Sequence, residues 1–228
     1  RLYRPFYENN VNIDVIPSDA TFDEYEVLLV PVMIVYKRNV QERIRKFVES
    51  GKTVVLSFRN SVKDYYNNLT LNEFNPTNFI DLVGAYVEEI ESFQGDQQIT
   101  LNGCEEFENI NGSATVFRDL LRTTTAETLF TYDDEFFEGL SAITLNKYQG
   151  GKVYYVGCGA DENIMDHLAN KILKESNIEI IKSPKGVEVV RRNINNEEKY
   201  FVMNHTDKTQ QLGDKTIKPY EAFIADHI

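Results

Sequence analysis

Tryptophan is absent from this chain of 228 residues, and cysteine and histidine are scarce, with two and three copies. Cys104 and Cys158 cannot build the disulfide framework of a small secreted protein, and they lack the paired CxxC spacing of a zinc site. The histidines, His167, His205 and His227, are scattered without metal-ligand spacing. We therefore expect no metal site and a reducing compartment.

Positively charged residues are also fewer than negatively charged ones. The chain carries 24 Lys and Arg against 36 Asp and Glu, a formal charge of -12. That charge repels phosphate backbones and anionic lipids, which argues against nucleic acid and membrane partners. No apolar run approaches the roughly 18 residues needed to span a bilayer. The GxGxxG, Walker and HExxH motifs are missing as well, so we expect no cofactor.

The clearest pattern present is a βαβ unit. Residues 27–31 and 53–58 are continuous apolar runs, typical of central parallel strands covered by helices on both faces. Between them, the helix ending at Gly51 places its apolar residues on one stripe, at Val40, Ile44, Phe47 and Val48. The pattern predicts an α/β fold.

A polar loop, residues 59–68, follows the second of these strands. Open α/β sheets usually place ligands at the carboxyl ends of their strands, so this loop is the first candidate site. Its side chains could meet a ligand, meet a neighbouring subunit, or pair with one another, and we favour the last two. The candidate contact residues are Arg59, Asn60, Ser61, Lys63, Asp64, Tyr65 and Tyr66.

Elsewhere the local patterns predict an opening helix at residues 2–7 and a strand at 11–16. Asn75-Pro76 is typical of a helix start, and that helix should end at Gly84. The pattern is weak over 93–111, where we expect an excursion or irregular hairpins. Further expected elements are strands at 86–90, 115–122 and 127–132, a hairpin of 142–147 with 152–156, and a helix capped by Asp161.

The last part of the chain has a different pattern. Residues 182–186 have linker composition, and short strands alone are expected at 187–192, 199–204, 210–212 and 222–225. About 45 residues of strands form too small a core to be stable alone, so this module must dock on another part. We expect an α/β domain over 1–182 and a small antiparallel β domain over 183–228.

Two groups of residues invite a catalytic interpretation. Gly157-Cys158-Gly159 lies between a strand and a helix, like a nucleophile elbow, but nothing in the sequence places His167 against the cysteine. The acidic runs Glu105-Glu106 and Asp133-Asp134-Glu135 point in different directions, whereas a glycosidase pair converges to about 5 to 10 Å. We expect a tight turn and solvated loops instead.

Several segments, in order, resemble the region that follows the barrel in family 42 glycoside hydrolases, which are β-galactosidases. They are residues 25–32 (YEVLLVPV), 47–59 (FVESGKTVVLSFR), 62–68 (VKDYYNN), 82–90 (LVGAYVEEI), 150–157 (GGKVYYVG), 200–207 (YFVMNHTD) and 218–222 (KPYEA). Relatives often have glycine where Thr77 stands and threonine at the Cys158-Gly159 turn. The resemblance covers nearly the whole chain.

The resemblance implies a glutamine-amidotransferase-like (flavodoxin-like) domain with a mostly parallel sheet, used for homotrimerisation, and then a small antiparallel β domain. The family's catalytic glutamates lie on a TIM barrel absent from these residues, so no catalytic residue is assigned here. We therefore expect the assembly region of a bacterial, cytoplasmic enzyme that hydrolyses terminal β-D-galactosides with retention and meets galactosides only through its barrel.

Two alternatives remain open. One is an independent amidotransferase-like cysteine hydrolase that uses Cys158, and the other is a carbohydrate-binding module in which Tyr200 or Tyr220 stacks on sugar. The chain begins at Arg1 and its first residues already resemble one face of a helix. We therefore expect a piece of a longer polypeptide, and export stays an open question.

Overall fold

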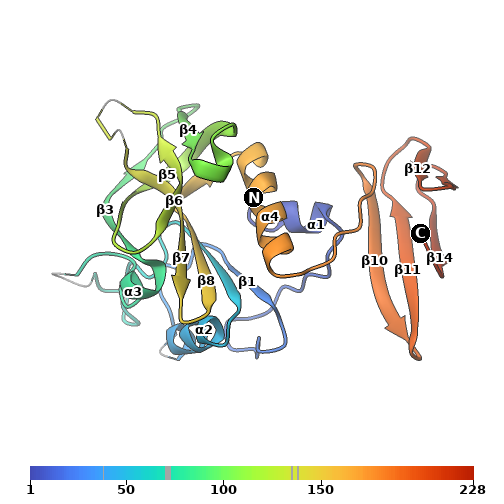
Figure 1. Cartoon of the computed structure of the whole chain (residues 1–228), viewed down its shortest axis with the longest axis horizontal. Helices are drawn as coiled ribbons and strands as arrows, with labels where there is room; N and C mark the ends of the chain where they lie inside the picture. Colours follow the sequence, from blue (N-terminus) through green and yellow to red (C-terminus); the bar gives the residue numbers. More distant parts are fainter. Residues whose placement is uncertain (38, 70–72, 135, 138) are drawn as a thin grey trace. The chain divides into compact units, whose positions relative to one another are not determined.

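The computed structural model describes residues 1–37, 39–69, 73–134, 136–137 and 139–228, which form two compact units (Figure 1). The first unit holds residues 1–2 and 16–168, and the second holds residues 3–15 and 169–228. The second unit thus joins the start of the chain to its end. A single domain boundary at residue 182 does not account for residues 3–15 in the second unit. The boundary itself stays a prediction.

A mixed sheet of nine strands organises the described part of the first unit. Pairing is parallel among β1, β2 and β8, and antiparallel in every other pair of the sheet, so the expected mostly parallel sheet is found only in part. The order is β1 (Val27–Val30), β2 (Thr53–Ser57), β8 (Gly151–Val156), β7 (Ser141–Tyr148), β6 (Glu127–Tyr132), β4 (Ile99–Gly103), β5 (Asn111–Thr123) and β3 (Ala85–Ser92), with β9 (Cys158–Ala160) paired to β5.

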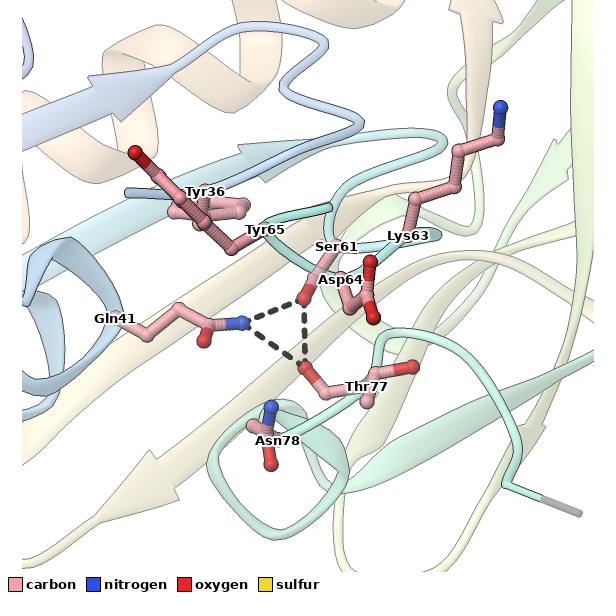
Figure 2. Close-up of a pocket in the computed structure, with 8 residues that line it drawn as sticks. All are labelled: Tyr36, Gln41, Ser61, Lys63, Asp64, Tyr65, Thr77 and Asn78. Carbon is pink, nitrogen blue, oxygen red and sulfur yellow. Dashed lines mark hydrogen bonds between the residues drawn. The ribbon is translucent and has the colours of Figure 1, made fainter. Parts of the chain in front are cut away.

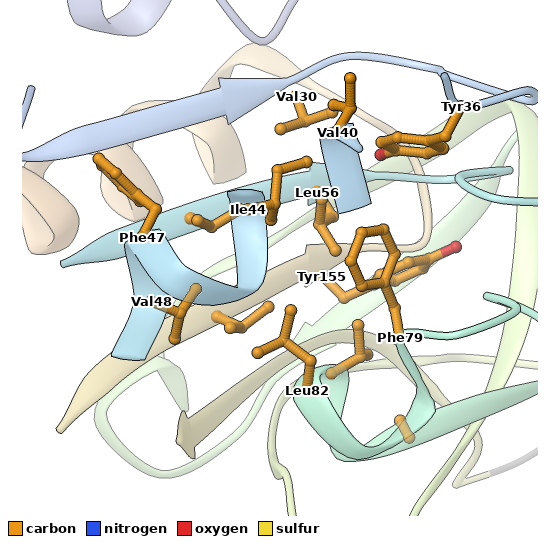
Figure 3. Close-up of a cluster of buried hydrophobic side chains, with 14 of the residues drawn as sticks. Val30, Tyr36, Val40, Ile44, Phe47, Val48, Leu56, Phe79, Leu82 and Tyr155 are labelled. Carbon is orange, nitrogen blue, oxygen red and sulfur yellow. The ribbon is translucent and has the colours of Figure 1, made fainter. Parts of the chain in front are cut away.

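The core of this unit lies between the sheet and two helices, α2 (Val40–Glu49) and α3 (Ile80–Val83) (Figure 3). The predicted stripe of α2 is confirmed, because Val40, Ile44, Phe47 and Val48 are all buried. Burying one such side chain contributes roughly 1.5 to 3 kcal/mol, so this stripe alone fixes the helix on the sheet. Gly51 and Gly84, at φ 93° and 68°, let the chain leave the two helices in a left-handed turn.

Two predictions about local structure are wrong in detail, whereas the irregular hairpin expected within 93–111 is found as β4 paired antiparallel with β5. The helix expected from Asn75-Pro76 starts only at Ile80, and residues 76–79 form a turn instead. Residues 11–16 form no strand, because no neighbouring strand pairs with them, and Val15 is exposed. The weak stretch 93–111 contains β4 and the 3₁₀ turn η1 (Glu105–Phe107), where apolar alternation is too short to stand out.

The second unit contains α1 (Arg4–Glu8), the end of α4 (Glu162–Glu175) and the carboxyl-terminal strands. Its small core joins five buried residues, Val187, Val189, Val202, Leu212 and Ile217. All four expected strand regions are strands, and Lys215–Ile217 adds one that was not expected. The two sheets are β10 (Val187–Ile194), β11 (Glu197–Asn204) and β14 (Ala222–Ala225), and β12 (Gln210–Leu212) with β13 (Lys215–Ile217).

Asn10 shows what the strand module docks on. Its side-chain amide donates to Ile181 O at 2.7 Å and Ser183 Oγ at 2.8 Å, and its oxygen accepts from Val189 N at 2.8 Å. Tyr7 adds a hydrogen bond from its hydroxyl to Glu188. The strand module thus contacts the amino-terminal segment within its unit, and the expectation that it needs such a partner for stability stays a prediction.

Candidate subunit-contact loop

The loop of residues 59–68 leaves the carboxyl end of β2, as expected, and its first turn is strained. Arg59 and Ser61 have φ of 55° and 54°, in the left-handed region that non-glycine residues rarely adopt. Arg59 N donates to Asp119 Oδ2 at 2.8 Å, and the Arg59 guanidinium carbon lies 4.8 Å from the centre of the Phe117 ring. Contacts with β5 thus hold this unusual backbone in place.

The base of the loop is buried and fully tied to its surroundings. Asn60 Nδ2 donates to Ser57 O at 2.6 Å, and its Oδ1 accepts a short hydrogen bond from the Tyr36 hydroxyl. Ser61 N donates to Met33 O at 2.9 Å. Buried polar groups cost free energy unless they are paired, so these bonds define one position for the base of the loop. Asn60 and Ser61 are structural residues.

The tip of the loop is exposed but ordered by Asp64. Its Oδ1 accepts from Tyr66 N at 2.9 Å and from Asn68 N at 2.8 Å. The backbone bond from Asn68 is the main cause that lowers the pKa of this carboxyl. Lys63 Nζ donates to Asn67 Oδ1 at 3.0 Å. The alternative in which Arg59, Lys63 and Asp64 pair with each other does not describe these bonds, because Lys63 binds Asn67, Asp64 accepts from backbone amides and Arg59 contacts β5.

A pocket of about 190 Å³ opens beside the loop (Figure 2). Figure 2 shows a triangle of hydrogen bonds in its wall, in which Gln41 Nε2 donates to Ser61 Oγ at 2.6 Å and to Thr77 O at 3.2 Å, and Ser61 Oγ donates to Thr77 O at 2.7 Å. These polar atoms already satisfy one another. The wall therefore offers a shaped recess rather than a catalytic pair. Its lining is Tyr36, Gln41, Ser61, Lys63, Asp64, Tyr65, Thr77 and Asn78.

Large apolar side chains are exposed on the loop and on the residues that follow it. Tyr65 is 53% exposed and Tyr66 67%, and their rings meet edge to face at 5.5 Å. Leu69 and Phe74, at 61% and 55%, extend the same stretch of chain. Tyrosine is favoured at protein interfaces because its ring is apolar while its hydroxyl is polar. The loop therefore exposes two neighbouring aromatic rings to its surroundings.

Asp119, on β5 of the same sheet, anchors the loop and was not among the residues singled out from the sequence. This carboxyl is buried and accepts hydrogen bonds from Tyr155 Oη at 2.6 Å and from Arg59 N. Burial raises its pKa to about 6. Among the described residues, Asp119 Oδ1 has no hydrogen-bond partner. An acidic residue next to the apolar pair Leu120-Leu121 in an expected strand was the one available signal.

Cys158 does not have the surroundings of a nucleophile. It lies in β9, fully enclosed, and burial raises the pKa of its thiol to about 12. A reactive cysteine needs the opposite shift. His167 is exposed on α4, where its Nδ1 bonds Asn163 O at 2.8 Å. The geometry therefore does not support the cysteine-hydrolase alternative.

The other sequence candidates do not form a site. Glu105 and Glu106 belong to the exposed turn η1, and Asp134 pairs with Arg118 at 2.8 Å, while Glu135 lies outside the described residues. Over the described ranges, no group of three or more His, Cys, Asp or Glu is placed to hold a metal ion, and none of the helices has the length and apolarity to cross a membrane.

The two tyrosines of the carbohydrate-binding alternative lie in different settings. Tyr200 is half-buried beside the small core of the second unit, where its hydroxyl donates to Glu198. Tyr220 is 72% exposed, at φ 55°. Sugar platforms usually combine several exposed rings. The tyrosines do not supply such a platform, since Tyr200 is half-buried.

Residues 1–179 match the β-galactosidase trimerisation domain, and residues 186–226 match the β-galactosidase C-terminal domain. The chain belongs to the family of β-galactosidase trimerisation domains. The resemblance to family 42 is thereby confirmed. In this chain the match to the trimerisation domain is followed by the match to the C-terminal domain.

Curated relatives of this trimerisation domain include β-galactosidase BgaP of Planococcus sp. (strain L4), 25% identical over 215 residues, and β-galactosidase Pbg of Clostridium perfringens, 28% identical over 223 residues. The alignments cover 93% and 94% of this chain but 32% of either relative. The chain thus spans about a third of the length of the curated relatives it matches.

Solved structures show the same fold. The β-galactosidase from Bacillus circulans sp. alkalophilus superposes with a TM-score of 0.86 at 26% identity, covering 99% of this chain and 35% of that one. The β-galactosidase from Rahnella sp. R3 superposes with a TM-score of 0.88 at 25% identity. The superposition covers 98% of this chain and 35% of that one. The mixed sheet with its small antiparallel sheets is therefore the architecture of this domain family.

Proposed function

We propose that this chain holds together the subunits of a β-galactosidase as a homotrimer, and that residues 59–68 lie at the contact between subunits. The observation that carries the proposal is the exposed pair Tyr65 and Tyr66 on a loop whose base, Asn60 and Ser61, is buried and fixed. A preordered aromatic surface loses little conformational freedom on binding, which favours association.

The proposal assigns no chemistry to these residues. The loop pocket has no nucleophile beside a base, and Cys158 is enclosed with a raised pKa. Hydrolysis of β-D-galactosides, with retention, would be carried out by a catalytic barrel outside these residues. The relatives' name, β-galactosidase, and the third of their length that this chain covers support this division of labour.

Three finer features belong to the same proposal. The domain boundary falls at residue 182, close to the limits of the two family matches. The parallel core β1-α2-β2 with β8 is the amidotransferase-like part of the architecture. The enzyme works in the bacterial cytoplasm, which agrees with two unpaired cysteines.

The test is the mass of the chain in solution by light scattering, beside an assay of β-galactosidase activity. We expect a trimer without activity for the unaltered chain. Arg59→Ala combined with Tyr66→Ala should shift the mass toward the monomer, because it removes one strained anchor and one exposed ring. Unchanged assembly of the double variant would count against the loop, and activity of the chain itself would overturn the assembly role.

A further inference from the structure

Arg59 and Asp119 meet at the base of the 59–68 loop, and each keeps one buried atom unpaired. Arg59 N donates to Asp119 Oδ2 at 2.8 Å, so the two residues are in direct contact. Among the described residues, Arg59 Nε and Asp119 Oδ1 are buried without a hydrogen-bond partner. The first atom is a donor and the second is an acceptor. Because an unpaired buried polar atom costs free energy, a bond between these two atoms would be favourable.

The guanidinium of Arg59 lies on the ring of Phe117 instead. Its carbon is 4.8 Å from the ring centre, and Phe58 stacks on the same ring at 6.0 Å between centres. Phe117 and Asp119 are two residues apart on β5, and both keep regular register with β3. Their side chains therefore share one face of the strand. Rotation of one flexible side chain can take the guanidinium from the ring to the carboxyl group.

Three other strands place uncharged groups against Asp119. The Tyr155 hydroxyl of β8 donates to Asp119 Oδ2 at 2.6 Å, and the Tyr132 hydroxyl of β6 donates to the main-chain oxygen of Asp119 at 3.1 Å. The Cys158 thiol of β9 is enclosed beside Tyr132. Burial raises the pKa of all three groups, so none of them carries a charge near neutral pH.

The neighbouring cations have other partners. Arg118, the preceding residue on β5, is paired with Glu91 and Asp134, and Arg1 donates to the Gly159 carbonyl. Arg59 is the cation that acts on the Asp119 carboxyl, where its charge and its backbone amide both lower the pKa.

The Asp119 carboxyl changes its charge between acidic and neutral pH. Burial raises its pKa to about 6, against the lowering effect of Tyr155 and Arg59. A protonated carboxyl needs no cation, which agrees with a guanidinium that lies on Phe117. An ionised carboxyl would leave Oδ1 as a buried charge without a donor, which costs far more than an unpaired neutral group.

We propose that Arg59 and Asp119 form a proton-controlled switch at the base of the loop. When Asp119 is protonated, the guanidinium lies on Phe117, as in this structure, and when Asp119 is ionised, the guanidinium turns to Oδ1 and forms an ion pair. The bonds of Asn60 and Ser61 fix the backbone, so only the side chain moves. Ionisation thus uncovers the Phe117 ring and neutralises one positive charge beside the loop.

The first test follows the aspartate carboxyl carbons by ¹³C NMR from about pH 4 to pH 8, with Asp119→Asn identifying the signal of Asp119. The unaltered chain should show a midpoint near pH 6. Arg59→Met removes the charge at the same backbone φ and should raise the midpoint by about 1 or more, because a nearby opposite charge lowers the pKa of a carboxyl by roughly 1 to 3. Arg59→Lys should restore part of that difference. Lys63→Met, which removes a positive charge from the same loop, should leave the midpoint unchanged.

The second test leaves Arg59 unaltered and records the NMR signal of its Nε–H group over the same pH range, with Arg59→Lys identifying the signal. The proton should feel the ring current of Phe117 at low pH and move to a hydrogen-bonded position at high pH, with the midpoint of Asp119. In Asp119→Asn it should keep its low-pH position throughout.

Three results would overturn the switch. They are an Asp119 midpoint that Arg59→Met leaves unchanged, an Arg59 signal that does not follow that midpoint, and an Asp119 that is ionised over the whole range. Both groups belong to one chain, so the switch goes beyond the proposed function and does not depend on it. The oligomeric state, measured by light scattering, decides the assembly role separately.

Discussion

At the scale of single residues, Asp119 is the carboxyl group that couples the loop to the sheet. Its pKa of about 6 lies above the usual value near 3.9, because burial disfavours the charged form. Between these two values the folded protein holds a proton that the unfolded chain releases. The contribution of Asp119 to stability is therefore present at low pH and is lost as the pH rises through about 6.

Replacing Asp119 by asparagine should remove this dependence. Asparagine can still accept from Tyr155 and from Arg59 N, so the fold should persist. A shift of about two pKa units corresponds to about 3 kcal/mol. The unaltered chain should thus lose up to that amount of stability, relative to Asp119→Asn, between pH 4 and pH 7. Urea unfolding at both values measures it, and parallel stability curves for the two proteins would show that Asp119 is not the group responsible.

Cys158 gives a second prediction at this scale. Because the thiol is enclosed and its pKa is raised to about 12, it should not react with a disulfide reagent at pH 8 while the chain is folded. Cys104→Ser leaves Cys158 as the one thiol in the chain, so any reaction with the reagent is that of Cys158. We expect one reactive thiol per chain in urea and none without it. Fast reaction in the folded state would restore the cysteine-hydrolase alternative.

At the scale of elements, the helices and strands with an uninterrupted apolar pattern could be predicted from the sequence. The helix α2 was predicted residue by residue, because a stripe of four buried residues over two turns has no other explanation. Residues 11–16 alternate as a strand does, but pairing depends on a neighbour that local sequence cannot specify. The strands β4, β9 and β13 were missed because glycine, asparagine or lysine interrupts their apolar pattern, whereas β12, as short as β9 and β13, was predicted.

For the candidate site, the position of the loop could be predicted from the sequence, but the residues that support it could not. The position of residues 59–68 after a central strand located the loop, since the carboxyl ends of parallel strands share one edge. Its support was not predictable, because Asp119 and Tyr155 lie far along the sequence and reach Arg59 and Asn60 only through sheet pairing. Likewise, the sequence around Val116 does not predict that its backbone is left-handed.

Asn60 tests the loop as an element. Asn60→Ala removes the bonds to Ser57 O and Pro31 O and leaves the buried Tyr36 hydroxyl without its acceptor. We expect a loss of about 2 to 3 kcal/mol and faster hydrogen exchange across residues 59–68. Lys63→Met, which removes one exposed bond of the same loop, should cost less than about 0.5 kcal/mol. Equal losses in the two variants would mean that the base does not order the loop.

At the scale of the whole molecule, Asn10 joins the two ends of the chain into one unit. Asn10→Ala removes three hydrogen bonds and places alanine at φ 54°, whereas Asn10→Gly removes the bonds but accepts the backbone. We expect a loss of about 2 kcal/mol or more for alanine and less for glycine. Protection of β10 and β11 amides in hydrogen exchange reports it, and Asn12→Ala, which removes one exposed bond to Arg191 O at 3.2 Å, should cost much less. Unchanged protection in Asn10→Ala would show that the strands fold independently.

The same link sets an order of events during protein synthesis. Asn10 and Val189 are 179 positions apart, yet they share a hydrogen bond in the small core of the second unit. A ribosome adds roughly 5 to 20 residues per second, so the opening helix waits roughly 10 to 40 seconds for its partner strand. During that interval Phe6, buried in the finished protein, has not yet met the strands of its unit. Within these residues, α1 is therefore made well before the strands with which it folds, which makes it a natural client for chaperones that bind nascent apolar segments.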